Sequence, residues 1–269
     1  MKIKQVTSYL ESIAPLSLQE EYDNSGLIIG NEEAEVNGAV ICIDCTEAVI
    51  DEAVEKKCNL IIAHHPIIFR GLKKITGETY VQRVVLKAIR NHISIYAIHT
   101  NLDNVIQGVN KKICDKLGLS NCKILSPRLT LPAPHGEGMG KKAGAGIIGM
   151  LAKPSTEISF LKKIKKSMKA GSLRHTSLLN KKVSKVAVCG GSGSFLLGEA
   201  IRQKADVFIT ADFKYHQFFD TENKILIADI GHYESEQFTK ELLRDLLKQK
   251  FSIFAARLSE INTNPINYL

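Results

Sequence analysis

Two adjacent histidines, His64 and His65, follow an apolar run and precede Pro66 in the sequence NLIIAHHPIIFRG. The apolar run predicts a buried strand, and side chains alternate between the two faces of a strand, so adjacent histidines ordinarily point in opposite directions. Because Pro66 favours an extended conformation in the residue before it, the backbone can turn both imidazoles into one crevice. Imidazole is a common ligand of divalent metals, so this pair is a candidate for metal binding.

Two further predicted strands end in residues of the same kind. The segment YAIHTNLD contains His99 and ends with Asp103, and ADIGHYESE contains His232 and, four residues later, Glu236. A spacing of four at a helix start puts His232 and Glu236 on one face, about one turn apart. Histidine and carboxylate ligands suit borderline divalent cations such as Zn, Mn, Fe, Co or Ni, without fixing which one.

The three segments together offer four histidines and two carboxylates. A site for one ion usually needs only three protein ligands and water. Six candidate ligands are therefore enough for two ions, with the carboxylate of Asp103 or Glu236 bridging them. The alternative is structural, because a histidine taken alone is more often a hydrogen-bonded residue than a ligand. Ligand-type residues at three strand ends favour the metal hypothesis, and His216 of ADFKYHQ is a further candidate.

Apolar runs alternate with helical patterns along most of the chain, which predicts βαβ crossovers and largely parallel sheets. Strands are expected at residues 38–44, 59–65, 93–100, 146–152, 172–178, 183–194, 205–210, 224–232 and 251–257. Helices are expected at 6–15, 46–57, 80–91, 105–118, 156–169, 195–203, 213–220 and 234–250. The segment 126–146 is rich in Pro and Gly and is expected to be a linker or loop.

These elements predict an α/β fold of two lobes, with mainly parallel sheets flanked by helices and a metal site in the cleft between the lobes. Residues 1–125 plus 225–269 form the predicted metal-binding lobe. Residues 126–224 form the second predicted lobe, which carries a basic face.

The formal net charge of +8 is concentrated between residues 153 and 185, which hold ten Lys or Arg and one acid, Glu157. Leu161, Ile164 and Met168 have helical spacing, so the neighbouring lysines line the outer face of an amphipathic helix. Such a face is commonly just a solvated surface, and the alternative is a surface that attracts the phosphates of nucleotides or nucleic acid.

The composition, with 44% hydrophobic and 24% charged residues, is typical of a soluble globular protein. No apolar run is long enough to span a bilayer, and the first residues lack the apolar core of a signal peptide, so we expect no membrane and a cytoplasmic location. Six scattered cysteines indicate reduced thiols rather than a disulfide framework. Cys42 and Cys45 form a CxxC without a second pair, which favours a structural role.

Six segments occur in an order that resembles a known family. They are YDNSGLIIG (22–30), AHHPIIF (63–69), HTNLDNVIQGVN (99–110), VAVCGGSG (186–193), ADFKYH (211–216) and DIGHYESE (229–236). The sequence is similar to the GTP cyclohydrolase 1 type 2 homologues, also called Ngg-interacting factor 3-like proteins, over nearly its whole length. The chain has the length of the short members, which lack an inserted domain.

The resemblance implies a two-lobed α/β protein with a dinuclear metal centre, assembled as a homohexameric ring. The implied metal ligands are His64, His65, Asp103, His232 and Glu236, all of which this sequence keeps. It departs from the usual family pattern within YDNSG and TADFKYH, and neither change touches a ligand. The remaining candidates for orienting ligands or transferring protons are His99, His216, Asp212 and Asp44.

The leading hypothesis is a hydrolase dependent on two divalent metal ions, with GTP as the substrate that the family name suggests and water attacking C8 of the purine. GGSG at 190–193 offers backbone amides that could hold phosphate, although a tight structural turn is the more ordinary role of such a cluster. The alternative is a metal-containing regulatory ring that binds nucleic acid or protein through residues 153–185 without catalysis.

Overall fold

The computed structural model describes residues 1–130 and 142–269, and it divides the chain into two compact units. The first unit comprises Met1–Leu102 and Thr239–Ile266, and the second comprises Asp103–Phe238 and Asn267–Leu269. Each unit has its own β-sheet flanked by helices, so the mixed α/β fold is confirmed. The units differ in extent from the expected lobes, because residues 103–125 and 225–238 belong to the second unit.

The sheet of the first unit has five strands in the order β1-β4-β3-β2-β11. Strands β2, β3, β4 and β11 are parallel to their neighbours, and β1 pairs with β4 in the antiparallel sense. The central strands are buried along their whole length, as expected for a sheet that is covered on both faces. The strand bounds are β1 Gly26–Ile29, β2 Ala39–Cys42, β3 Leu60–Ala63, β4 Ser94–Ala97 and β11 Ala256–Leu258.

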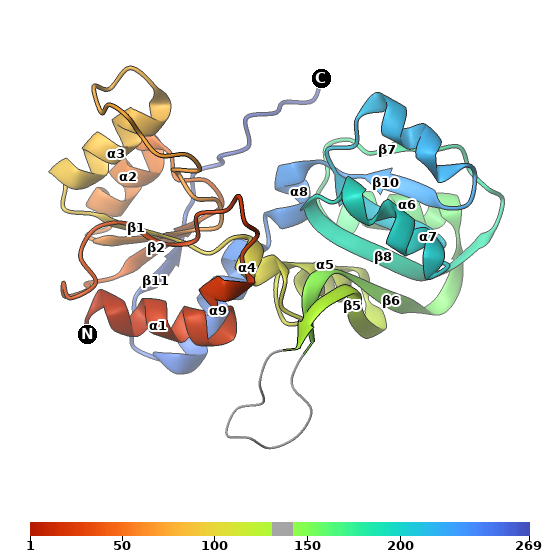
Figure 1. The fold of residues 1–269 in the computed structure, drawn as a ribbon, viewed down its shortest axis with the longest axis horizontal. Helices are drawn as coiled ribbons and strands as arrows, with labels where there is room; N and C mark the ends of the chain where they lie inside the picture. Colours follow the sequence, from red (N-terminus) through yellow and green to blue (C-terminus); the bar gives the residue numbers. More distant parts are fainter. Residues whose placement is uncertain (131–141) are drawn as a thin grey trace. The chain divides into compact units, whose positions relative to one another are not determined.

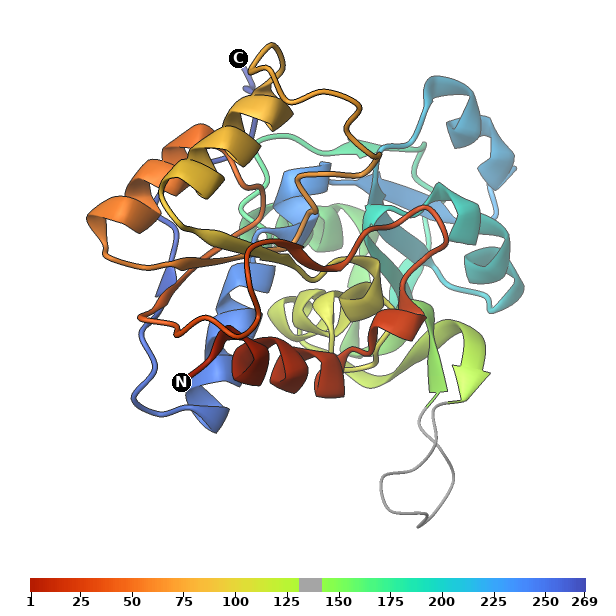
Figure 2. The same ribbon diagram turned by 60° about the vertical axis from the view of Figure 1, so that its left-hand side comes forward.

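Helices cover both faces of this first sheet, with α2 and α3 on one face and α1 and α9 on the other in both views (Figures 1 and 2). Thr46 and Thr79 cap α2 and α3 by accepting hydrogen bonds from Val49 N–H and Gln82 N–H, which satisfies amides that a helix start leaves unpaired. The helix bounds are α1 Ile3–Ile13, η1 Leu16–Leu18, α2 Glu47–Glu55, α3 Tyr80–Arg90 and α9 Thr239–Lys250. One further short helix, α4 (Thr100–Asp103), ends where the second unit begins.

The sheet of the second unit has six strands in the order β5-β6-β8-β9-β10-β7, of which only β8, β9 and β10 are mutually parallel. Its strands are β5 Leu119–Thr130, β6 Lys142–Thr156, β7 Arg174–His175, β8 Lys182–Ser192, β9 Val207–Ala211 and β10 Leu226–Asp229. Helices α5 Val109–Leu117 and α6 Glu157–Ser167 pack on β6 and β8. The remaining helices are η3 Ser194–Leu196, α7 Leu197–Arg202, η4 Tyr215–Thr221 and α8 His232–Glu236.

Two sequence-based predictions about secondary structure are wrong. Residues 126–130 and 142–146 belong to the antiparallel strands β5 and β6, while 131–141 of the expected linker lie outside the described residues. Because β5 is an edge strand with irregular register near Pro127, it accommodates a proline that a central strand would not. The single helix expected at 234–250 is two helices, since α8 ends in the second unit and α9 begins in the first.

Across the described residues, no helix combines the length and the apolar character that crossing a membrane requires.

Candidate functional site

Three histidines of the first unit meet at the carboxyl edge of its parallel sheet. His64 and His65 follow β3, and His99 follows β4, the strand that pairs with β3 in register Ala63↔Ala97. The ring centroids lie 5.0 Å apart for His64 and His65, and 5.3 Å apart for each of these rings with His99. One ligand nitrogen from each ring lies within 4.8 Å of the others, a spacing that could hold a metal ion.

Each of these three rings is oriented through its Nδ1 atom. The Nδ1–H of His64 donates to the Ile98 carbonyl oxygen at 2.8 Å. His65 Nδ1 lies 2.8 Å from Asp44 Oδ1, and His99 Nδ1 lies 2.8 Å from Asp23 Oδ1. An acceptor at Nδ1 keeps the proton of the neutral ring there and presents the Nε2 lone pair as the ligand atom, which is the usual arrangement around metal-binding histidines.

Asp23 is held firmly in place beneath His99. Its carboxylate accepts hydrogen bonds from Asn24 N–H at 2.7 Å, from Ser25 O–H at 3.1 Å and from both the N–H, at 3.1 Å, and the O–H of Thr100. Burial alone would raise the pKa of Asp23, but the hydrogen bonds and the charge of His99 outweigh it and hold that pKa well below its ordinary value. Asp23 therefore stays ionised at neutral pH. Sequence reasoning gave Asp23 no role of its own, because its partners lie far away in the chain.

The second unit carries a different cluster, built on the short helix α8. His232 opens α8 directly after Gly231, and its Nε2 lies 3.2 Å from Oε2 of Glu236, which is buried. His232 Nδ1 lies 2.6 Å from Asp212 Oδ2, so this ring is also oriented by a carboxylate at Nδ1. Asp212 follows β9 with a left-handed φ of 59°, a conformation that aspartate tolerates better than most residues.

The charges around His232 favour its protonated form. Burial lowers the pKa of His232, but the charge of Glu236 and the hydrogen bond with Asp212 outweigh this effect and raise the pKa to about 11. Without an ion, the ring and the Glu236 carboxylate therefore form an ion pair at neutral pH. A cation that binds both groups takes the place of this proton, as metal ions generally do at histidine ligands.

The glycines of GGSG allow the second cluster to form. Gly191 has a φ of 62°, and a Cβ added there would collide with Oε1 of Glu236. The Gly191 N–H donates to Ser235 O–H oxygen at 2.9 Å, and the Gly190 N–H donates to Asn110 Oδ1 at 2.8 Å. Because these amides are already used within the unit, they do not form the phosphate cradle considered from the sequence. The glycines instead let the backbone approach Glu236 closely.

Asp103 is connected to the same loop through Asn110. The Asn110 side chain donates to the Asp103 carbonyl oxygen at 3.1 Å, while its Oδ1 accepts from Gly190 N–H. Burial is the main reason that the pKa of the Cys189 thiol is raised, and the charges of Asp103 and Glu236 add to that rise. Two carboxylates therefore act on the same buried thiol within the second unit.

His216 lies outside both clusters. It is exposed on η4, where its ring centroid lies 5.1 Å from that of Tyr215 and 6.4 Å from that of Phe219. Tyr215 and Phe219 are themselves exposed, so these three rings pack on one another at the surface.

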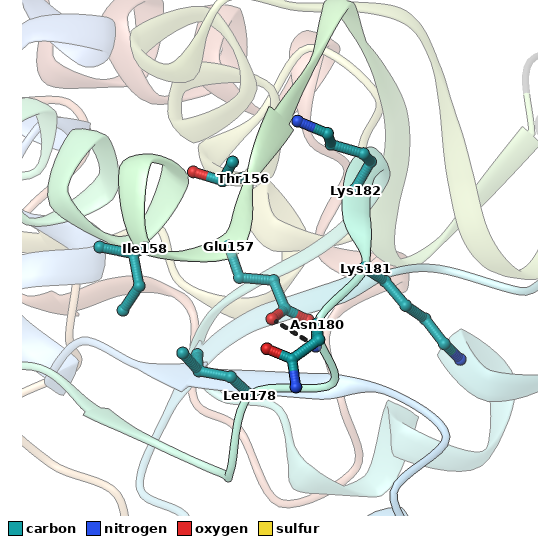
Figure 3. A pocket seen from close by; sticks show the side chains of 7 residues that line it. All are labelled: Thr156, Glu157, Ile158, Leu178, Asn180, Lys181 and Lys182. Carbon is teal, nitrogen blue, oxygen red and sulfur yellow. Dashed lines mark hydrogen bonds between the residues drawn. The ribbon is translucent and has the colours of Figure 1, made fainter.

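A pocket of about 280 Å³ lies within the basic segment of the second unit (Figure 3). Its lining residues are Thr156, Glu157, Ile158, Leu178, Asn180, Lys181 and Lys182. The buried Glu157 carboxylate accepts hydrogen bonds from the N–H groups of Leu179 and Asn180, at 3.1 and 3.0 Å. Lys181 and Lys182 diverge from one another in Figure 3. None of the predicted metal ligands lines this pocket.

The donor chemistry of both clusters fits divalent cations. The first unit offers neutral imidazole nitrogens, and the second offers an imidazole and buried carboxylates, which together are the N and O ligands of zinc and its first-row neighbours. At each of the four rings an oxygen atom lies against Nδ1, which is the usual arrangement around metal-binding histidines.

Comparisons with known proteins agree on one family. The model of the Duf34/NIF3 (NGG1p interacting factor 3) family matches residues 1–265. A Clostridium acetobutylicum protein named GTP cyclohydrolase 1 type 2 homolog is 38% identical over 237 residues, which cover 88% of this chain and 85% of that protein. A Staphylococcus epidermidis protein of the same name is 29% identical over 370 alignment positions, with all of both chains covered. That relative therefore carries residues without a counterpart in these 269.

Solved structures have the same fold. A hypothetical protein of Staphylococcus aureus matches with a TM-score of 0.92 and 33% identity, over 100% of this chain and 99% of that one. A Bacillus cereus protein related to NIF3 matches with a TM-score of 0.91 and 26% identity over the same shares.

Proposed function

Since this chain belongs to the Duf34/NIF3 family, we propose that it is a dinuclear, divalent-metal-dependent hydrolase that acts on a nucleotide-like substrate. The observation that carries the proposal is the shared orientation of four histidines. His64, His65, His99 and His232 each have Nδ1 against a carbonyl or carboxylate oxygen, which leaves Nε2 of His64, His65 and His232 for a cation and Nε2 of His99 for a proton.

The proposed ligands are those implied by the family resemblance, and they come from both units. His64 and His65 belong to the first unit, while Asp103, His232 and Glu236 belong to the second. In the proposal, the adjacent histidines and the carboxylates of Asp103 and Glu236 would hold two ions together with His232. The ions are drawn from Zn, Mn, Fe, Co and Ni, because this donor set accepts all five. A ring of six copies, also implied by the resemblance, is part of the proposal and is measured by light scattering.

Two divalent ions, when bound, lower the pKa of a water molecule and stabilise the charge that develops on the electrophile. The chain's own residues then hold and move protons. His99 is the proposed proton carrier, because its ring lies beside His64 and His65 and is hydrogen-bonded through Nδ1 to the ionised Asp23. His216 is a second candidate for proton transfer from the second unit, and its exposed position on η4 would let it meet a substrate from solvent.

GTP is the first substrate to test, because the Clostridium acetobutylicum and Staphylococcus epidermidis relatives bear the name GTP cyclohydrolase 1 type 2 homolog. Purified protein loaded with Mn²⁺, Zn²⁺ or Fe²⁺ is expected to hydrolyse GTP, with chelation abolishing the activity. His65→Ala should remove both activity and bound metal, as counted by elemental analysis. The matched control is His175→Ala, which changes an exposed histidine on β7 and should alter neither. Metal-loaded protein that is inert toward a broad panel of nucleotides would contradict the proposal.

A second candidate function is nucleic-acid binding by the basic segment 153–185. Lys162, Lys165 and Lys166 are exposed on α6 and offer their charge to solvent, whereas Lys163 donates to the Leu117 carbonyl oxygen at 2.6 Å. This candidate predicts DNA affinity that falls steeply with salt, because each neutralised phosphate releases counterions.

The test reverses three exposed lysines of α6 together and leaves Lys163, which is bound to the Leu117 carbonyl oxygen, in place. Lys162→Glu, Lys165→Glu and Lys166→Glu should abolish DNA binding at about 100 mM salt and flatten the salt dependence. The control reverses the exposed Arg70, Lys73 and Lys74 of the first unit, an equal change of charge. Equal loss of affinity in both triple variants would indicate a general charge effect and would rule out a binding face on α6.

A further inference from the structure

A pair of thiols in the second unit belongs to neither histidine cluster. Cys114 is buried on α5, and Cys122 is half-buried on β5. The Cys114 and Cys122 thiols, which are both free, lie close enough to share a side-chain hydrogen bond. One member of the pair is thus reachable from solvent, and the other is covered.

The backbone around Cys122 explains how its thiol meets α5. The pairing of β5 with β6 shifts register between Ser120 and Lys123, and Asn121 between them has a left-handed φ of 52°. Such a bulge redirects a side chain that a regular strand would hold elsewhere. The Cys122 sulfur also lies 3.6 Å from the Leu119 carbonyl oxygen. A Cβ added at Gly149 would lie only 3.1 Å from the Cys122 sulfur, so glycine at 149 leaves room for this thiol.

The surroundings make the two thiols chemically unequal. The hydrogen bond from Cys114 is the largest effect on the pKa of Cys122. Burial opposes it, but the nearby charge of Lys111 adds to it, and together they lower that pKa to about 7, against the smaller effect of Asp115. The same hydrogen bond and burial raise the pKa of Cys114. At neutral pH Cys122 is therefore the nucleophile of the pair, and Cys114 keeps its proton.

The CxxC of the first unit has the opposite character. Cys42 and Cys45 are buried, and burial raises the pKa of both thiols, to about 12 for Cys45. A thiol that is covered and protonated reacts slowly with oxidants. The pair that the sequence spacing singled out is inert, and the pair formed by tertiary structure is the reactive one.

We propose that Cys114 and Cys122 form an oxidisable dithiol that hydrogen peroxide converts into a disulfide. The Cys122 thiolate attacks one peroxide oxygen, the O–O bond breaks, and the departing hydroxide takes up a proton to leave as water, with Cys122 oxidised to a sulfenic acid. Cys114 then loses its proton and attacks that sulfur. The S–O bond breaks, a second water leaves with that proton, and the S–S bond forms.

The test treats the reduced, full-length chain with one equivalent of hydrogen peroxide at neutral pH and maps the product by mass spectrometry. The expected product has lost two hydrogen atoms and contains a peptide in which Cys114 is joined to Cys122. In Cys114→Ser, the reaction should stop at a Cys122 sulfenic acid that dimedone traps. In Cys122→Ser, peroxide consumption should slow by about tenfold, since the remaining thiols all have raised pKa values.

Cys58→Ser is the matched control, because it removes a buried thiol of the first unit and should leave the disulfide yield unchanged. Oxidation that joins other cysteines, or that leaves Cys114 and Cys122 free, overturns the proposal. A second measurement uses the unaltered chain in case the serine variants do not fold. The alkylation rate of Cys122 should be half-maximal at a pH below the ordinary thiol value of about 8.5, because the pKa of this thiol is lowered, and a midpoint at or above that value overturns the proposal as well.

Discussion

The histidine cluster of the first unit and the α8 cluster of the second prepare ligands in different ways. In the first unit, the positions come from neighbouring parallel strands that end at one edge, and the donors are imidazoles. In the second, a short helix presents His232 and the buried Glu236, and the cluster exists because glycine at 191 leaves room for the carboxylate.

The difference teaches that the histidine cluster depends on the register of neighbouring strands, whereas the α8 cluster depends on the close approach of the Gly191 backbone to Glu236. Strand ends bring His64, His65 and His99 together through ladder register, which a change in one side chain does not disturb. The second cluster concentrates buried charge, since Glu236 is 2% exposed, and buried charge needs fixed partners. We therefore expect the second cluster to be the more sensitive to substitution.

The largest expected effect is at Gly191. Gly191→Ala places a methyl group against Oε1 of Glu236 and forces alanine into a left-handed φ of 62°, so the free energy of unfolding should fall by about 3 kcal/mol. Urea denaturation measures the change.

Gly198→Ala is the matched control for that substitution. Gly198 lies in α7, where an added Cβ meets no atom within 4 Å, so alanine should leave stability unchanged or raise it by about 0.5–1 kcal/mol. If both variants have the same free energy of unfolding, the close approach of the Gly191 backbone to Glu236 does not stabilise the second cluster.

An intermediate effect is expected from the carboxylates that orient the histidines. Asp212→Asn should weaken metal affinity by about 10–100-fold, because His232 is held at Nδ1 by Asp212. Asp44→Asn should weaken it less, by about tenfold at most, since His64 and His99 beside His65 keep their own acceptors. Competition with a chromophoric chelator measures both affinities.

Asp245→Asn is the control for these two substitutions, because Asp245 pairs with Arg244 in α9 at 2.7 Å, away from the histidines of its unit. Metal affinity should be unchanged in this variant. If Asp44→Asn and Asp212→Asn weaken metal affinity equally, the two clusters do not differ in their sensitivity to substitution.

The smallest effect on the free energy of unfolding is expected at Glu52, a residue of the first unit that lies outside the histidine cluster. The buried Glu52 accepts hydrogen bonds from Ser259 O–H and, at 2.8 Å, from Glu260 N–H, which anchors the chain beyond β11. Burial alone would raise the pKa of Glu52, but the bonds from Glu260, Lys56 and Ser259 outweigh it and lower that pKa. Glu52→Gln should cost about 1 kcal/mol at pH 7 and leave metal affinity unchanged.

The sign of the pH dependence follows from the lowered pKa. The ionised Glu52 stabilises the fold above the unfolded-state pKa of about 4.3, and this contribution is lost as pH falls through the lower folded-state value. The stability difference between the parent chain and Glu52→Gln should therefore shrink in acid. Glu55→Gln, at an exposed position of α2, should show no such difference at any pH. If the stability difference between the parent chain and Glu52→Gln stays the same in acid, Glu52 does not stabilise the fold through its charge.

Much of the first unit could be predicted from its sequence because its signals are local. The apolar runs of β2, β3 and β4 and the caps Thr46 and Thr79 lie within a few residues of the elements they define. The second unit was harder, since β5 and β6 contain the prolines and glycines that usually mark loops. The break between α8 and α9 was also missed, because Phe238, buried in the second unit, and Leu242, four residues later in α9 of the first unit, continue one helical pattern.

By itself the sequence determined which residue types stand at the ends of the strands, and hence that imidazoles and carboxylates are available for a metal. Tertiary structure alone decided that Asp23 supports His99 across 76 positions of chain, that Gly191 admits Glu236, and that Cys122 meets Cys114. The physical reason is the separation along the chain between the residues that interact. A strand or a cap depends on neighbours within one or two turns, whereas the pKa and orientation of a buried group depend on atoms that only the folded chain brings near.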